Sequence, residues 1–527
     1  MVLVLLTALV TAVAVSWAVL TPPFRAPDEA QHLNSVVRLA HGGGWPAPGQ
    51  ATMAPAVLRA QVQAAVTTDL PGRYHDRPDR AQFVDVAPPP VAERSRVGVP
   101  TPPPGTPVAV STTDQMTQHP PLYYAVAAAF LRLTGLADAR WDLQLLALRL
   151  LSVVLVLPVV PLAATAARRL TGSAAAGLVA ASLVLFAPQV GHVLGSVTND
   201  SLMALTGAVT VWLCVRVLTG DLRYRTAAVL GLTLGLGLLT KVMAGLALPV
   251  VVAAYLLAPG ERGLGARLGR VASALGIAFV VGGWWWLRNI VVHGTVQPDG
   301  MGQRFEDREP GGAWEFWSTA VWRLLRSSVG DLGWLELRAP TPYVVAAGVA
   351  CVALCVVPLI VPGLRRRAAV LLGFPALVAL TVLVNAWSFY EAHGWYAGIQ
   401  GRYLFGATVA VAAVAATGAW TCLRRSERRT AAVLPLVVLA GLVVAIGGLC
   451  FGLVTMYRGP GDSVADALVR WEAWSPLGGA GLGIAVAAVP VVGLAAVLAA
   501  ALLRGRPERA GDGGPGLVSA GPGPAGS

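Results

Sequence analysis

The fold is decided near the amino terminus by residues 2–32, which read VLVLLTALVTAVAVSWAVL and then TPPFRAPDEAQH. The first part lacks charged side chains, and about 17–25 apolar residues suffice to cross a bilayer. Asp28, Glu29 and His32 follow within twelve residues. If a helix begins near Pro27, spacings of three and four residues place all three on one helical face. Acids in a first turn also suit the helix dipole, so a capped interfacial helix is the alternative to a functional site.

The composition is that of a polytopic membrane protein. Hydrophobic residues make up 55% of the 527 residues and charged residues only 13%, whereas about 25% of an average soluble domain is charged. The net charge of +12 comes almost entirely from arginine, because Lys241 is the single lysine. The arginines gather in short clusters between apolar runs, as in cytoplasmic loops that face anionic lipid. The charge therefore indicates a lipid bilayer as partner and no nucleic acid.

The apolar runs predict an all-α polytopic membrane protein with about twelve transmembrane helices. A large first extracytoplasmic loop follows the first helix, and residues 119–135 are too short and too polar to cross, so they predict a re-entrant or juxtamembrane helix. The expected spans cover residues 2–20, 143–167, 174–194, 202–218, 226–239, 242–257, 271–290, 343–361, 368–389, 403–423, 431–454 and 479–503.

Four regions follow from these spans. They are a first transmembrane helix at 1–20, an extracytoplasmic loop with juxtamembrane helices at 21–142, a transmembrane bundle at 143–503, and a disordered cytoplasmic tail at 504–527. Arginine clusters fall at every second connection, which is a positive-inside pattern. We therefore expect a multi-pass plasma-membrane protein with both ends in the cytoplasm.

Polar residues concentrate near the span ends of the predicted outer face. Ionisable groups at such depth are costly and tend to mark a site, although cations that snorkel to the interface are the alternative. For Asn199 and Asp200, which come at a predicted helix start, capping is the interpretation that the pattern favours, with a site role second. The residues concerned are Asp28, Glu29, His32, His119, Asn199, Asp200, Lys241, Arg288, Tyr390, His393, Arg402 and Tyr403.

Several ordered motifs resemble those of the GT-C class of membrane glycosyltransferases, which includes the protein O-mannosyltransferases and the aminoarabinose transferase of lipid A. Pro27-Asp28-Glu29 with His32 resembles the acidic motif of the first loop. The stretch from His119 to Tyr124, HPPLYY, is similar to the Lys-Pro-Pro-Leu-Tyr-Tyr motif and includes Tyr123. Thr198-Asn199-Asp200-Ser201 and Thr240-Lys241 resemble two further polar turns of the class.

Three stretches are more similar to an uncharacterised bacterial family of GT-C-like membrane proteins. They are Gly330-Asp331-Leu332-Gly333-Trp334, Gln400-Gly401-Arg402-Tyr403-Leu404, and the HPPLYY stretch with histidine in place of lysine. The combination of these stretches is specific, whereas each alone is weak.

The resemblance implies an enzyme that transfers a sugar from a polyprenyl-phosphate donor on the extracytoplasmic face. The matching residue for a general base, or for a ligand of a divalent metal such as Mg²⁺, Mn²⁺ or Zn²⁺, is Asp28, with Glu29 as second catalytic carboxylate. A base and a cationic clamp on the departing phosphate are the chemistry that such a transfer needs. The clamp is expected from His119, Lys241, Arg288 and Arg402.

Some roles stay open at this level. His119 either replaces the cation of the class motif or binds a metal together with Asp28 or His32. Tyr390 and His393 belong to an aromatic stretch that lines a sugar subsite or forms an interfacial belt. The acceptor is a cell-wall or surface glycan, a lipid or a protein. The rival function is a transporter or flippase of lipid-linked glycans, which would place its ionisable residues near the bilayer midplane.

Overall fold

The computed structural model describes residues 1–66, 84, 86–98, 113–260, 263–300 and 308–503. The tail predicted at 504–527 lies outside the described residues, as do parts of the predicted first loop. Within the described ranges the chain is helical apart from its loops and one short hairpin of strands β1 (Asp331–Leu332) and β2 (Leu337–Arg338). The prediction of an all-α polytopic membrane protein is confirmed.

Nine helical segments of the described residues are long and apolar enough to cross a membrane. A tenth candidate is a pair bent by 75°. This pair consists of α7 (Ala174–Leu183) with the 3₁₀ turn η5 (Val184–Phe186), followed by α8 (Pro188–Leu194). The nine are α1 (Val2–Leu20), α5 (Trp141–Val156) with α6 (Val159–Thr171), α9 (Asp200–Leu218), α12 (Leu264–Ala278) with η7 (Phe279–Gly283) and α13 (Trp284–His293), α15 (Thr341–Ile360), α16 (Arg365–His393), η8 (Gly401–Ala407) with α17 (Thr408–Cys422), α18 (Glu427–Tyr457) and α20 (Gly478–Leu503).

The remaining two of the twelve predicted spans are helices that are shorter than a full crossing. They are α10 (Tyr224–Leu238) and the segment of η6 (Val242–Ala247) with α11 (Leu248–Leu257). Thr240 and Lys241 interrupt the apolar run between them. The helix α4 (Leu122–Leu133) has 12 residues, so it is about 18 Å long and does not bridge a hydrocarbon core of about 30 Å. The prediction of a short juxtamembrane helix after His119 is therefore correct.

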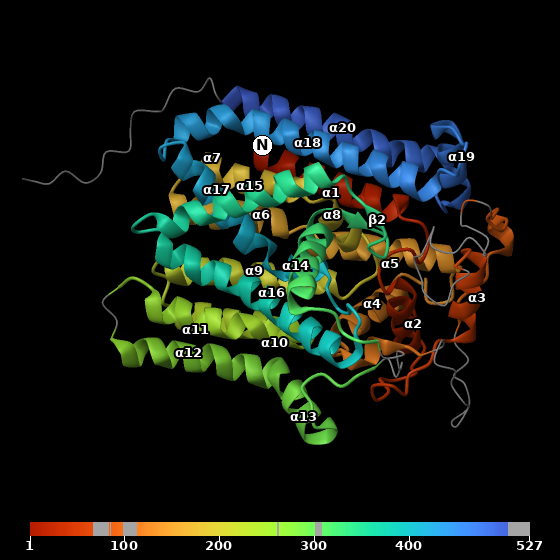
Figure 1. The fold of residues 1–527 in the computed structure, drawn as a ribbon, viewed down its shortest axis with the longest axis horizontal. Coiled ribbons are helices and arrows are strands. Elements are labelled where there is room, and N and C mark those ends of the chain that lie inside the picture. Colours follow the sequence, from red (N-terminus) through yellow and green to blue (C-terminus); the bar gives the residue numbers. More distant parts are fainter. Residues whose placement is uncertain (67–83, 85, 99–112, 261–262, 301–307, 504–527) are drawn as a thin grey trace, which may run out of the picture.

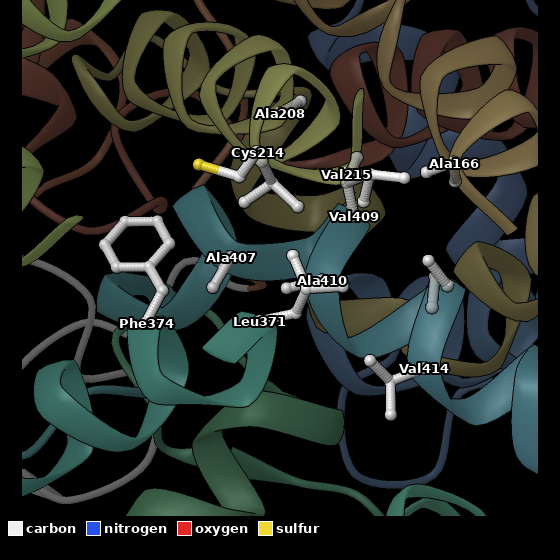
Figure 2. Close-up of a cluster of buried hydrophobic side chains, with 14 of the residues drawn as sticks. Ala166, Ala208, Cys214, Val215, Leu371, Phe374, Ala407, Val409, Ala410 and Val414 are labelled. Atoms are coloured by element: carbon white, nitrogen blue, oxygen red, sulfur yellow. The ribbon is translucent and has the colours of Figure 1, made fainter. Parts of the chain in front are cut away.

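Small side chains let the central helices approach closely. Figure 2 shows alanine, valine and cysteine side chains of α9 and α17 packed against α6 and α16. A methyl group on Gly207 of α9 would lie 2.1 Å from the carbonyl oxygen of Gly406 in η8. Such contacts between small residues are the usual means by which membrane helices pack. They fix η8 against the first half of α9.

Three short helices, α2 (Glu29–Ala40), α3 (Pro55–Gln63) and α4, lie together at one end of the bundle (Figure 1). The short turns η2 (Val91–Glu93) and η4 (Gln115–Gln118) belong to the same region. Asp114 attaches η4 to α2, because its Oδ2 accepts hydrogen bonds from Asn34 Nδ2 and Ser35 Oγ, both at 2.7 Å. Two further helices, α14 (Ala313–Val329) and α19 (Val464–Trp474), precede α15 and α20.

Candidate active site

The chain segment after α1 is held by a buried arginine. Arg149 of α5 donates to the carbonyl oxygens of Ala18, Thr21 and Pro22 at 2.9, 2.6 and 3.0 Å. Its guanidinium also forms a buried bidentate pair with Glu29, with distances of 2.8 and 2.7 Å. The backbone N–H of Val197 donates to the same carboxylate at 3.1 Å. The Glu29–Arg149 pair therefore fixes the first residue of α2 against α5.

Asp28 points in a different direction from Glu29. Its backbone has φ +60°, in the left-handed region, and α2 begins only at Glu29. Asp28, Glu29 and His32 therefore do not share one helical face, and this prediction is wrong because Asp28 precedes the helix. A non-glycine residue in the left-handed region costs of order 1–3 kcal/mol, and such strain concentrates at functional sites.

The Asp28 carboxylate meets two donors from distant parts of the chain. Gln115 Nε2 donates to Oδ1 at 2.9 Å, and Arg402 Nη2 donates to Oδ2 at 2.5 Å. The Asp28 and Arg402 side chains are 10% and 7% exposed. The carboxylate of the first-loop motif and the arginine of the Gln400–Leu404 stretch thus form one buried ion pair.

Asp200 and Lys241 extend this pair into a network of four charges. Lys241 Nζ lies 2.5 Å from Asp200 Oδ1, and Arg402 Nε lies 3.7 Å from Asp200 Oδ2. The ring of Tyr403 lies under the cations, with its centroid 4.8 Å from Lys241 Nζ. We call Asp28, Asp200, Lys241 and Arg402 the charge network. It comprises two acids and two bases, so its formal charge is zero.

The charge network lies at one end of the bundle because of where its helices begin and end. Asp200 is the first residue of α9, and Arg402 is the second residue of η8. Lys241 follows α10, and Asp28 follows α1 after a short connection. Helix starts and ends that meet in this way bring the four ionisable groups within ion-pair distance of one another.

Glycine contacts position Arg402. A methyl group on Gly401 would lie 2.2 Å from the backbone nitrogen of Ser328. The Gly401 N–H donates to Ser327 Oγ at 2.8 Å. The α14 helix therefore supports one side of the Arg402 segment, while α9 contacts Gly406 at the other side. Only glycine at 401 permits this close approach of two backbones.

Two histidines and two tyrosines border the charge network. His32 Nδ1 is 3.0 Å from the Tyr124 hydroxyl, and the His32 ring meets the Tyr123 ring edge-on with centroids 6.3 Å apart. Burial, followed by the positive charges of Arg402 and Lys241, lowers the pKa of His32 well below its usual value. Burial and Lys241 lower the pKa of His119 to about 3. Both imidazoles are therefore neutral at physiological pH, which does not favour His119 as a replacement cation.

The donor atoms around Asp28 do not fit a divalent metal. Its two oxygens accept from Gln115 and Arg402, and the arginine already balances the carboxylate charge. His119 Nδ1 is buried and has no hydrogen-bond partner among the described residues. Within the described ranges there is also no group of three or more histidine, cysteine or acidic residues arranged to hold a metal. Metal binding by Asp28 and His119 stays an untested prediction, and no chemical step below depends on it.

The Asn199–Asp200 turn supplies no side-chain cap to α9. The Asn199 side chain makes no capping hydrogen bond, and its Nδ2 is buried without a partner among the described residues. Thr198 Oγ1 accepts from the backbone N–H of Asp200 at 3.2 Å instead. The interpretation of Asn199 and Asp200 as helix caps is therefore wrong, because Asp200 is engaged by Lys241.

Three predicted site residues have other surroundings. Arg288 is exposed on α13 and lies 5.5 Å from the centroid of the Trp285 ring. The Tyr390 hydroxyl accepts from Gly311 N at 2.7 Å, and its ring belongs to an aromatic cluster with Phe316, Trp387 and Tyr396. His393 ends α16, and its ring centroid lies 4.7 Å from that of Phe389. For Arg288 this is the geometry of an interfacial cation.

Three contributing residues were not predicted. Arg149 had a signal, since an arginine inside the apolar run 143–167 is costly unless paired. Tyr124 is part of the HPPLYY stretch, but nothing in the sequence distinguishes it from Tyr123 as a site residue. Gln115 has no local signal, because only the fold brings its amide to Asp28.

Comparison with known proteins identifies the family. Residues 12–411 match the family described as "Predicted membrane protein (DUF2142)". The chain belongs to this family. Among curated proteins, nothing matches the chain. The family description names a membrane protein and no activity, so a function for this DUF2142 member has to be argued from its site.

Solved structures give further similarities. The chain is similar to ArnT from Cupriavidus metallidurans in the apo state, with 15% identity and a TM-score of 0.45, covering 92% of this chain and 74% of that one. The same protein bound to undecaprenyl phosphate gives 15% identity and a TM-score of 0.45. That match covers 92% of this chain and 77% of the ArnT chain. The oligosaccharyltransferase of Archaeoglobus fulgidus in the apo form is 12% identical to this chain, with a TM-score of 0.41. The match covers 92% of this chain and 59% of that one.

Proposed function

We propose that this protein is a glycosyltransferase that moves a sugar from a polyprenyl-phosphate donor to an extracytoplasmic acceptor at the plasma membrane. The observation that carries this proposal is the buried charge network, in which a strained carboxylate faces two cations at one end of the spans. Asp28, Asp200 and Lys241 come from motifs that resemble those of GT-C enzymes, and Arg402 comes from a stretch that resembles the uncharacterised GT-C-like family.

The cations suit the phosphate of a lipid-linked donor. Lys241 and Arg402 lie at helix ends, which is where the proposal places the phosphate of the lipid-linked donor. Three buried nitrogens in and around these cations have no hydrogen-bond partner among the described residues. They are Arg402 Nε, Asn199 Nδ2 and His119 Nδ1. Leaving a buried polar group unpaired costs about 1–3 kcal/mol. A ligand rich in oxygen atoms would satisfy these nitrogens.

Asp28 supplies a base for the acceptor. In the proposed step an acceptor hydroxyl oxygen attacks the anomeric carbon, and its proton passes to the Asp28 carboxylate. The bond from that carbon to the phosphate oxygen breaks, and the electron pair remains on the phosphate beside Lys241 and Arg402. When the donor phosphate binds Arg402, the Asp28 carboxylate is released from its ion pair and is free to accept a hydrogen bond from the acceptor hydroxyl.

The proposal is tested by transfer from a panel of polyprenyl-phosphate sugars to extracted cell-envelope acceptors. Purified wild-type protein in lipid is expected to transfer one of these sugars. Asp28→Asn is expected to lower turnover by about 10²–10⁴-fold, which is the usual contribution of a general base. Asp138→Asn is the matched control, since Asp138 is 77% exposed and pairs with His41 at the surface.

A transporter of lipid-linked glycans is the second candidate, and the bend between α7 and α8 favours it, because broken helices line transport sites. Transporters place their binding groups near the bilayer midplane, whereas the charge network lies where helices begin and end. Movement of a fluorescent polyprenyl-phosphate sugar between leaflets, without chemical transfer, would support this candidate over the enzyme.

A further inference from the structure

His192 joins two parts of the molecule that the proposed reaction does not directly involve. It lies on α8, and its side chain is completely buried. Its Nδ1 is 3.1 Å from Thr21 Oγ1, directly after α1. Its Nε2 is 3.1 Å from the backbone nitrogen of Gly333, in the β1–β2 hairpin.

The partners of His192 define its tautomer. The Gly333 N–H can only donate, so Nε2 must accept with its lone pair. The hydrogen of the neutral ring therefore lies on Nδ1, which donates to the Thr21 hydroxyl oxygen. The ring also packs edge-on against Trp17 of α1, with centroids 5.5 Å apart. Both nitrogens are satisfied only while the imidazole is neutral.

On the hairpin side, the contacts lead to Arg402. Asp331 in β1 forms an ion pair of 3.1 Å with Arg326 in α14. Ser327, the next residue of α14, accepts the hydrogen bond from Gly401 that fixes the Arg402 segment. The hairpin, α14 and Arg402 are therefore connected by consecutive contacts.

On the other side, the contacts lead to Asp28. The carbonyl oxygen of Thr21 accepts from Arg149, and Arg149 pairs with Glu29, which is adjacent to Asp28. His192 is thus the direct bridge between the segment that carries Asp28 and the hairpin that supports Arg402.

We propose that His192 is a positioning residue that sets the register of Asp28 against Arg402 through its two hydrogen bonds. The catalytic part of this inference rests on the proposed transferase function, whereas the bridge itself does not. Without the bridge, the hairpin loses its hydrogen-bonded link to the segment after α1, and a shift of about 1 Å in a reacting group costs about a hundredfold in rate.

The test compares His192→Leu, which removes both hydrogen bonds, with His192→Gln, which keeps a donor and an acceptor. Thr21→Val removes one partner alone. His41→Gln is the matched control, because His41 also uses both ring nitrogens but pairs with Val37 and the exposed Asp138. Each purified protein in lipid is measured by hydrogen exchange over residues 330–338, by ¹⁵N NMR of labelled histidine, and by transfer kinetics.

The NMR signals of wild-type protein should include one imidazole in the Nδ1–H form that disappears in His192→Gln. His192→Leu should lose exchange protection of the hairpin and about a hundredfold in kcat/KM for transfer. His192→Gln should recover most of both, and His41→Gln should match wild type. Unchanged hairpin protection in His192→Leu, or a His192→Gln protein no better than the leucine variant, would overturn the inference. If wild type transfers no sugar, the exchange and NMR results still decide the bridge, and the proposed function fails separately.

Discussion

At the scale of single residues, Asp28 and Glu29 are neighbours with different surroundings. The sequence shows two adjacent acids and cannot separate them, since both suit the start of a helix. The fold separates them through one backbone angle, which directs Asp28 toward Arg402 and leaves Glu29 with Arg149. Partners that lie 374 and 120 residues away decide the roles, and no local pattern contains that information.

Lys241 offers a test that separates stability from donor binding. Lys241→Ala leaves the Asp200 carboxylate with the more distant Arg402 as its ion-pair partner, and breaking a buried pair typically costs about 3–5 kcal/mol of folding free energy. Adding Asp200→Asn removes the unpaired charge, so the double variant should regain much of the lost melting temperature. Its Kd for a polyprenyl-phosphate sugar should still be weakened. Arg288→Ala, which removes an exposed cation, is the control for both measurements. A double variant that binds donor like wild type would contradict the clamp.

His32 predicts a pH dependence of stability. Its pKa is lowered in the folded protein, so the native state resists a proton that the unfolded chain accepts below about pH 6.5. Stability is therefore complete above that pH and is lost as the pH falls, by up to about 1.4 kcal/mol per pH unit for one group. His32→Gln should flatten the fall in melting temperature between pH 6.5 and 4.5. Equal acid sensitivity in wild type and variant would count against a neutral buried His32.

At the scale of elements, the lengths of the apolar runs predicted where the helices lie, and predicted the residues at the helix ends less accurately. All twelve expected spans occur as helices, because a run of apolar residues in lipid must satisfy its backbone internally. The α10 and η6–α11 segments cover nearly the residues expected, and they are shorter than a full crossing because Thr240 and Lys241 interrupt the apolar run between them. The bend at Pro188 was not expected, although proline is a common cause of such breaks.

The contact between η8 and α14 predicts the effect of one methyl group. In Gly401→Ala the new carbon would lie 2.2 Å from Ser328 N, so the Arg402 segment must shift. We expect a loss of about 1–3 kcal/mol in stability, as for other overpacked sites, together with a lower kcat/KM. Gly447→Ala is the control, because nothing lies within 4 Å of its added methyl group. Thermal unfolding and transfer kinetics measure both effects, and a fully active Gly401→Ala protein would refute this account of Arg402 positioning.

At the scale of the whole molecule, the short helices α2–α4 and the long helices of the bundle are joined by buried charges. Figure 1 shows α2, α3 and α4 at one end of the long helices, and the Glu29–Arg149 pair fastens them to α5. The sequence could predict that such a unit exists, from the polar stretch after the first span. It could not predict its attachment, because that depends on pairs far apart in the chain.

The Glu29–Arg149 pair should therefore matter for folding more than for chemistry. Glu29→Gln leaves a buried arginine without its anionic partner, and the expected cost is about 3–5 kcal/mol. We expect a lower melting temperature and yield, while the folded fraction keeps a turnover per active site within a few-fold of wild type, because the glutamine amide oxygen still accepts a hydrogen bond from Arg149 and so keeps the segment that carries Asp28 in place. A normal melting temperature with turnover as low as that of Asp28→Asn would show instead that Glu29 is the catalytic carboxylate.

The most direct measurement compares donor binding and transfer in the same Asp28→Asn preparation. If Asp28 is the base and Lys241 with Arg402 holds the phosphate, the variant should bind a polyprenyl-phosphate sugar at least as tightly as wild type, since Arg402 is freed from its acid. Single-turnover transfer from that bound donor should fall by about a hundredfold or more. Transfer at the wild-type rate from the bound donor would contradict the account.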